Sequence, residues 1–243
     1  MIVRSFLIRS VNIGGIGLNS YRLVINLKDK VVLDSCNFSI RTPNLQNITG
    51  INKKPSMEAK EILKIHIAKT AVLTDGQFDY FFSHFKRKSF QKGQAIITDG
   101  DQVDCEYFVI SGCLKTFYIN DDLKMFILQF AMPNWWASDY NALYNQTKAT
   151  INVDCITDAE VFCLTNSDRE KLCNELHNAE HFFRWRTNKG YVATQKRLLS
   201  FMNNNVKYRY EELLKLYPEL YNMVPKNLIA AYLGVSRETL SRL

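Results

Sequence analysis

Between residues 89 and 164 the chain alternates short apolar runs with turn residues, and this alternation restricts the fold more than any other feature. Glycines mark several of the turns, at Gly93, Gly100 and Gly112. Short strands separated regularly by turns are typical of antiparallel barrels and double-sheet rolls. The strand-like runs cover residues 89–91, 94–98, 106–110, 114–119, 125–130, 151–156 and 159–164. We therefore predict an α+β protein built around an antiparallel β-roll of the double-stranded β-helix or jelly-roll type.

Helical periodicity flanks the predicted roll on both sides. Residues 58–67 and 75–88 repeat apolar positions at helical spacing, and the phenylalanines of the second segment are expected to be core. After the roll, a short helix is expected to begin at a Ser167 or Asp168 cap and to end at Leu176. Two further helices are expected at residues 179–203 and 206–217.

The long helix expected over residues 179–203 carries Trp185, Val192 and Leu199 seven residues apart. Apolar residues at this spacing form one stripe along a helix, and a partner helix can cover such a stripe. We therefore predict a homodimer contact through residues 179–203.

The last twenty residues predict two short helices around a tight turn. Leu233 closes an apolar face on the first helix, and Gly234 can adopt the left-handed conformation that ends it. Ser236 is a good cap for the second helix, whose Leu240 and Leu243 are expected to face inward. This order is the helix-turn-helix pattern, in which the second helix presents its N-terminal residues to the DNA major groove.

Charge is unevenly distributed along the chain. Residues 57–176 carry twelve basic and seventeen acidic side chains, whereas residues 177–243 carry eleven basic and five acidic ones. An acidic middle followed by a basic end fits a sensing module joined to a DNA-binding one. We therefore predict four segments: a weakly structured extension (residues 1–56), the β-roll (57–176), a dimerisation helix (177–204) and a DNA-binding segment (205–243). We expect Met57 to be the natural start of the protein.

The six cysteines are scattered, and none forms a C-x-x-C pair. This spacing does not resemble a zinc site, so free thiols in a reducing compartment are expected. No apolar run approaches the ~20 residues that a membrane helix needs, and the N-terminus lacks a signal sequence. We therefore expect a cytoplasmic protein with no membrane partner.

The predicted order of roll, long helix and helix-turn-helix resembles the Crp/Fnr family of bacterial transcription regulators. The resemblance covers about residues 60–243. Its motifs are residues 92–101 (KGQAIITDGD), 107–112 (YFVISG), 157–161 (TDAEV) and 236–242 (SRETLSR), while residues 134–136 and 217–226 look like the branch common in Bacteroidetes. The resemblance implies a cyclic-nucleotide-binding-type sensor roll and a winged helix-turn-helix.

In this family the residues that match Arg237, Glu238 and Arg242 face base edges. Arginine can bond guanine O6 and N7 together, and glutamate can accept from cytosine N4. The resemblance thus implies a dimer on double-stranded DNA, with an inverted repeat whose half-sites lie ~34 Å apart. The expected DNA-binding residues are Ser236, Arg237, Glu238, Thr239, Arg242 and Lys226.

The sensor departs from the family's cyclic-nucleotide site. There a Gly-Glu pair holds the ribose and an arginine holds the cyclic phosphate, whereas here Asp139 and Lys148 stand at the corresponding places. Lysine lacks the planar fork of arginine. We therefore expect an unidentified effector other than cyclic AMP, or none, with Ser138, Asp139 and Lys148 as the candidate pocket. We expect no cofactor, since the iron–sulfur branch's cysteine cluster is absent.

Two alternatives remain open. Because the chain stops at Leu243, within the recognition helix by family standards, it could be a truncated sensor that binds a small molecule or partner without binding DNA. Separately, His177, Glu180 and His181 form an H-x-x-E-H pattern, which zinc proteases use. A zinc hydrolase is the more distant alternative, because no third ligand is evident nearby.

Overall fold

The computed structural model describes residues 5–7, 22–24 and 58–243. The chain divides into two compact units, Met1–Lys54 and Pro55–Leu243. In the first unit, β1 (Ser5–Leu7) and β2 (Arg22–Val24) pair in antiparallel register. The predicted extension over residues 1–56, and the start at Met57, otherwise fall outside the described residues and stay predictions.

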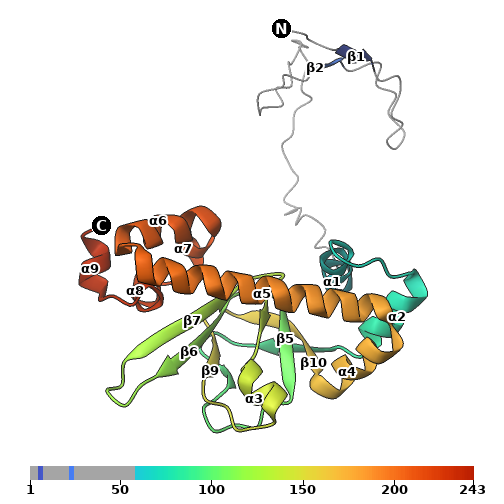
Figure 1. The fold of residues 1–243 in the computed structure, drawn as a ribbon, viewed down its shortest axis with the longest axis horizontal. Coiled ribbons are helices and arrows are strands. Elements are labelled where there is room, and N and C mark those ends of the chain that lie inside the picture. The colour runs from blue at the N-terminus through green and yellow to red at the C-terminus, as the bar shows by residue number, and fades with distance from the viewer. Residues whose placement is uncertain (1–4, 8–21, 25–57) are drawn as a thin grey trace, which may run out of the picture. The chain divides into compact units, whose positions relative to one another are not determined.

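The second unit contains two four-stranded antiparallel sheets, with strand orders β3-β10-β5-β8 and β4-β9-β6-β7 (Figure 1). Every predicted strand-like run overlaps one observed strand, so the antiparallel double-sheet architecture is confirmed. The short β8 had no counterpart among the predicted runs. The strands are β3 (Lys86–Phe90), β4 (Ala95–Ile97), β5 (Cys105–Ser111), β6 (Leu114–Ile119), β7 (Met125–Ala131), β8 (Trp136–Ala137), β9 (Asn152–Cys155) and β10 (Ala159–Thr165).

Helices precede, interrupt and follow these strands. The long α5 runs across the strands in Figure 1, with α1, α2 and α4 towards one end and α6 to α9 towards the other. The helices are α1 (Ala59–Ala68), α2 (Asp75–Ser83), α3 (Tyr140–Asn145), α4 (Asn166–Glu175), α5 (His177–Asn203), α6 (Val206–Leu216), α7 (Leu220–Met223), α8 (Lys226–Leu233) and α9 (Arg237–Ser241). None of these described helices combines the length and apolar character that crossing a membrane requires.

Two of the helix boundaries that differ from the prediction have a clear structural cause. The helix predicted over residues 75–88 ends at Ser83, because Lys86–Phe90 pairs with β10 as the edge strand β3. The cap of α4 is Thr165, whose hydroxyl accepts from the Asp168 amide at 3.0 Å, and not Ser167 or Asp168. The cap precedes the predicted position because β10 passes directly into the helix.

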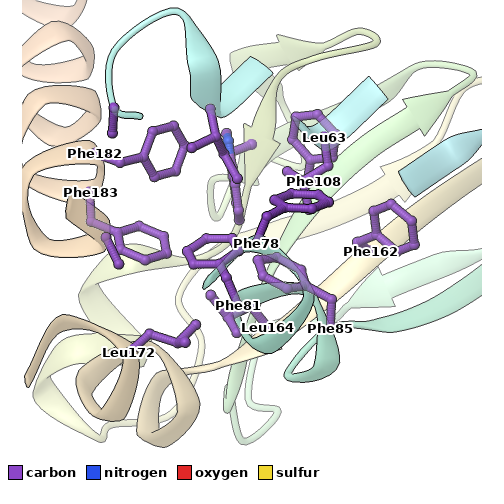
Figure 2. Close-up of a cluster of buried hydrophobic side chains, with 14 of the residues drawn as sticks. Leu63, Phe78, Phe81, Phe85, Phe108, Phe162, Leu164, Leu172, Phe182 and Phe183 are labelled. Atoms are coloured by element: carbon purple, nitrogen blue, oxygen red, sulfur yellow. The ribbon is translucent and has the colours of Figure 1, made fainter. Parts of the chain in front are cut away.

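The first sheet is covered on its outer face by α1, α2, α4 and α5. Aromatic side chains dominate this layer; Phe81 of α2, for example, lies 5.8 Å from Phe183 of α5 between ring centroids. The members drawn and labelled in Figure 2 are Leu63, Phe78, Phe81, Phe85, Phe108, Phe162, Leu164, Leu172, Phe182 and Phe183. The predicted core role of the α2 phenylalanines is therefore confirmed.

Two further cores complete the layered structure. The inner faces of the sheets meet in a core that includes Val109, Leu114 and Val161. The outer face of the second sheet packs against α6 to α9, where Ile127 and Phe130 of β7 join residues of the C-terminal helices. The central strands β5 and β10 are buried on both faces, which explains why they have near-continuous apolar sequences.

Candidate nucleic-acid interface and sensor region

Helices α8 and α9 meet at the glycine turn that the sequence predicts. Gly234 has φ 73° and ψ 26°, which is the left-handed conformation. The Ser236 hydroxyl caps α9 by accepting from the Thr239 amide at 3.2 Å. Leu240 is buried as expected, but the expectation for Leu243 is wrong, because this residue follows the last turn of α9 and is exposed.

The six residues expected to contact DNA all lie exposed on the C-terminal segment: Ser236, Arg237, Glu238, Thr239, Arg242 and Lys226. Of the ion pairs within residues 58–243, none uses Arg237, Arg242 or Lys226. A hydrogen bond from its own backbone amide, and a second from Ser236, lower the pKa of Glu238. Glu238 therefore remains an ionised acceptor beside the cationic side chains.

Two arginines hold the end of α8 in place. Arg197 of α5 donates to the Tyr232 carbonyl at 3.2 Å, and Arg209 of α6 donates to the Leu233 carbonyl at 3.0 Å. The last carbonyls of a helix lack partners within the helix and carry partial negative charge, so cations stabilise them. Arg197 also donates to the Ile127 carbonyl of β7 at 2.8 Å, and it thereby links the sheet to the turn before α9.

The candidate pocket residues lie around α3. Asp139 is only 1% exposed and caps α3 by accepting from the Ala142 amide at 3.1 Å. Its second carboxylate oxygen accepts from the Thr150 amide at 2.9 Å, which fixes the loop that carries Lys148. Ser138 donates to the Cys105 carbonyl at 2.8 Å, whereas Lys148 is exposed. The structure thus brings Asp139 and this loop together, but the carboxylate is already hydrogen-bonded within the chain.

One surface hollow in the described part of the chain has no α3 residue in its lining. It has a volume of about 410 Å³ and opens over the ends of β3, β5 and β10, near Ser111 and Asp158. A smaller cavity of about 80 Å³ lies between α1 and α2. Neither is lined by Ser138, Asp139 or Lys148.

A buried ionic cluster that no sequence motif predicts adjoins α3. Glu106 of β5 is fully buried and accepts from Arg186 of α5 at 2.6 Å, while Arg169 of α4 lies 3.8 Å away. Burial opposes the charge of Arg186, but the Glu106 carboxylate more than offsets this, so the pKa of Arg186 is raised. The Arg186 guanidinium also lies 4.2 Å from the Trp136 ring centroid. The only sign of this cluster in the sequence is Glu106 itself, an acidic residue inside the apolar run of β5.

The outer surface of α5 carries the predicted apolar stripe. Trp185, Val192 and Leu199 are all partly exposed, at 41, 43 and 51% respectively. Tyr191, Leu198 and Met202 add further exposed apolar area on the same helix. A helix of 27 residues is about 40 Å long, so the stripe offers an extended surface.

The H-x-x-E-H pattern lies at the start of α5. Glu180 accepts from Arg184 at 2.9 Å, and the Arg184 guanidinium also lies 3.2 Å from Nδ1 of His181. Within the described residues, no three His, Cys, Asp or Glu side chains gather closely enough to hold a metal ion. The geometry therefore gives no support to the zinc hydrolase alternative.

Comparisons with known proteins agree with this architecture. Residues 87–175 match the cyclic nucleotide-binding domain. No curated protein matches the chain in a sequence comparison. The chain is similar to the c-di-GMP responsive global regulator CLP from Xanthomonas campestris, with 16% identity and a TM-score of 0.57, over 70% of this chain and 89% of that one.

Two further solved structures share the fold. FixK2 from Bradyrhizobium japonicum has 18% identity and a TM-score of 0.54, over 65% of this chain and 81% of that one. A protein from Eubacterium rectale, described as a transcriptional regulator of the Crp/Fnr family, has 13% identity and a TM-score of 0.56, over 70% of this chain and 81% of that one. Residues 87–175 are thus similar to a cyclic nucleotide-binding domain, within a fold like that of Crp/Fnr regulators.

Proposed function

We propose that the protein is a dimeric transcriptional regulator of the Crp/Fnr type, which binds an inverted-repeat operator through the helix that begins after Ser236. The observation that carries this proposal is the exposed, unpaired set of Arg237, Arg242 and Lys226 around a capped helix, on a fold shared with Crp/Fnr regulators. In this proposal α8, the Gly234 turn and α9 form the helix-turn-helix, and Arg237 and Glu238 contact base edges.

The dimer in this proposal forms through α5. Two copies would bury the stripe of Trp185, Val192 and Leu199 against each other and present two copies of α9. Two half-sites about one turn of DNA apart would then match the two-fold symmetry of the dimer. A regulator of this kind acts in the cytoplasm, and it is not an enzyme.

The proposed sensor is the β-roll, with an effector other than cyclic AMP. An effector near α3 would meet the exposed ammonium of Lys148, whereas Ser138 and Asp139 shape the loop around it. Because Asp139 is only 1% exposed and both of its oxygens accept hydrogen bonds within the chain, a ribose hydroxyl could reach it only if the surrounding loop moved. Calorimetric titration with cyclic AMP should therefore give no binding heat.

The DNA-binding proposal is tested by selecting bound sequences from a random pool at a fixed salt concentration, since phosphate contacts are salt-sensitive. Arg237→Ala should relax the base preference and cost about 1–3 kcal/mol of specific binding. Arg87→Ala removes the same charge from the exposed edge strand β3 and should leave the preference intact. An unselective pool for the unaltered chain would favour a sensor without DNA binding.

A further inference from the structure

Cys105 and Cys163 lie on the same face of two neighbouring strands. In the antiparallel register of β5 and β10, Cys105 is opposite Thr165 and Tyr107 is opposite Cys163. The two cysteines are therefore diagonal neighbours, which is within reach for side chains on one sheet face. The two side chains are close enough for each to shift the pKa of the other: the pKa of Cys105 is raised and that of Cys163 is lowered.

The pair lies at the end of the sheet. Cys105 is the first residue of β5 and is partly exposed, while Cys163 is 3% exposed and lies two residues before the end of β10. Small molecules can therefore approach from the Cys105 side. A disulfide between diagonal cysteines requires their Cα atoms to come within about 7 Å, so bond formation would draw the ends of β5 and β10 slightly together.

The surroundings favour a thiolate on Cys163. The neighbouring Cys105 thiol lowers the pKa of Cys163, and the nearby ammonium groups of Lys88 and Lys86 add to this effect, although burial opposes it. Lys86 is directly opposite Cys163 on the edge strand β3. A thiolate is the nucleophilic form of cysteine, so Cys163 is the more reactive partner.

The other described cysteines differ in this respect. Burial raises the pKa of Cys113 to about 12 and that of Cys155 to about 11, and it also raises the pKa of Cys173. These three thiols remain protonated at neutral pH and are poor nucleophiles. The chain therefore contains internal controls for any reaction at Cys163.

We propose that Cys105 and Cys163 form a reversible redox pair, which hydrogen peroxide converts to a disulfide across β5 and β10. The Cys163 thiolate attacks one peroxide oxygen, which gives a sulfenic acid and releases hydroxide. Cys105 then loses its proton and attacks the sulfenic sulfur, which forms the S–S bond and releases a second hydroxide. Two thiols and one peroxide thus yield one disulfide and two waters, and thiol reductants reverse the reaction.

The test uses the full chain, treated with hydrogen peroxide and then alkylated. Trypsin with a glutamyl endopeptidase separates the cysteines, because Glu106 and Glu160 divide their neighbours. Cys105 is then in residues 93–106 and Cys163 in residues 161–169, each without another cysteine. Mass spectrometry should find these two peptides joined, with the loss of two hydrogens, and dithiothreitol should separate them again.

Variants assign the two roles. Cys105→Ser should leave a sulfenic acid on Cys163 that a dimedone probe captures, while Cys163→Ser should abolish probe labelling at Cys105. Cys173→Ser changes a partly buried cysteine outside the pair and should leave the link unchanged. The proposal is overturned if peroxide joins other cysteines equally fast, or if residues 93–106 and 161–169 stay separate in the unaltered chain. Neither outcome depends on DNA binding.

Discussion

The guanidinium of Arg197 lies 3.9 Å from the ring centroid of Tyr232 and donates a hydrogen bond to the carbonyl of the same residue. One side chain of α5 therefore fixes both the backbone and the ring at the end of α8. Because Arg197 also bonds to β7 carbonyls, the sheet, the long helix and the C-terminal segment meet at a single cation.

Replacing Arg197 should loosen the C-terminal segment. Arg197→Lys keeps the charge but removes the planar fork, so at least one carbonyl among Ile127, Leu128 and Tyr232 loses its donor. Hydrogen bonds from charged groups contribute about 1.5–3 kcal/mol, and we expect a loss of this order in stability. Hydrogen exchange should show faster exchange in residues 226–241. Arg184→Lys, on an exposed part of α5, should not change the exchange there.

Replacing Glu106 should be more destabilising than replacing an exposed carboxylate. Glu106→Gln leaves the charge of Arg186 buried without its carboxylate partner, which costs about 3–5 kcal/mol. Glu160→Gln makes the same change in an exposed pair with Arg87 and should cost less than about 1 kcal/mol. Urea unfolding of both variants measures the difference. Equal midpoints would contradict the importance of the buried cluster.

The partly buried His66 should make the protein acid-sensitive. Its Nε2 accepts from the Trp136 indole at 3.4 Å, and burial, with contributions from Lys69 and Arg186, lowers the pKa of His66 from 6.5 to about 4. The unfolded chain therefore gains a proton below pH 6.5 that the folded chain gains only near pH 4. Stability should fall as the pH drops through this window.

Urea unfolding midpoints between pH 7 and pH 4 measure this effect. His66→Gln can still accept from the Trp136 indole through its amide oxygen but does not titrate, so its midpoint should depend less on pH. A parallel pH dependence in the variant and the unaltered chain would show that other groups cause the acid sensitivity.

The proposed dimer should depend on the exposed stripe of α5. Leu199→Asp places a charge within that surface, and burying it against a second copy would be costly. Sedimentation velocity should show a shift from dimer to monomer. Leu123→Asp, at the exposed β6–β7 hairpin, should leave the dimer unchanged. An unaltered dimer in Leu199→Asp would place the contact elsewhere.

Local patterns predicted most of the elements, because strands, caps and the Gly234 turn depend on nearby residues. The end of α2 could not be predicted in this way: Lys86, Arg87 and Lys88 are compatible with the last turn of a helix, and only pairing with β10 makes them a strand. The helix-turn-helix pattern in the sequence also predicted correctly which residues of α9 are exposed. It could not reveal the Glu106–Arg186 pair, because those residues are 80 positions apart and meet only in the folded chain.

The core shared by the second sheet and helices α6 to α9 limits how the chain can be divided. A fragment that ends at residue 204 would uncover Ile127 and Phe130 of β7, and such an apolar face favours aggregation. A chimaera that exchanges the C-terminal helices for those of another protein would meet the same difficulty. Its new helices would have to carry side chains that fit this sheet face, so α6 to α9 are not an interchangeable module.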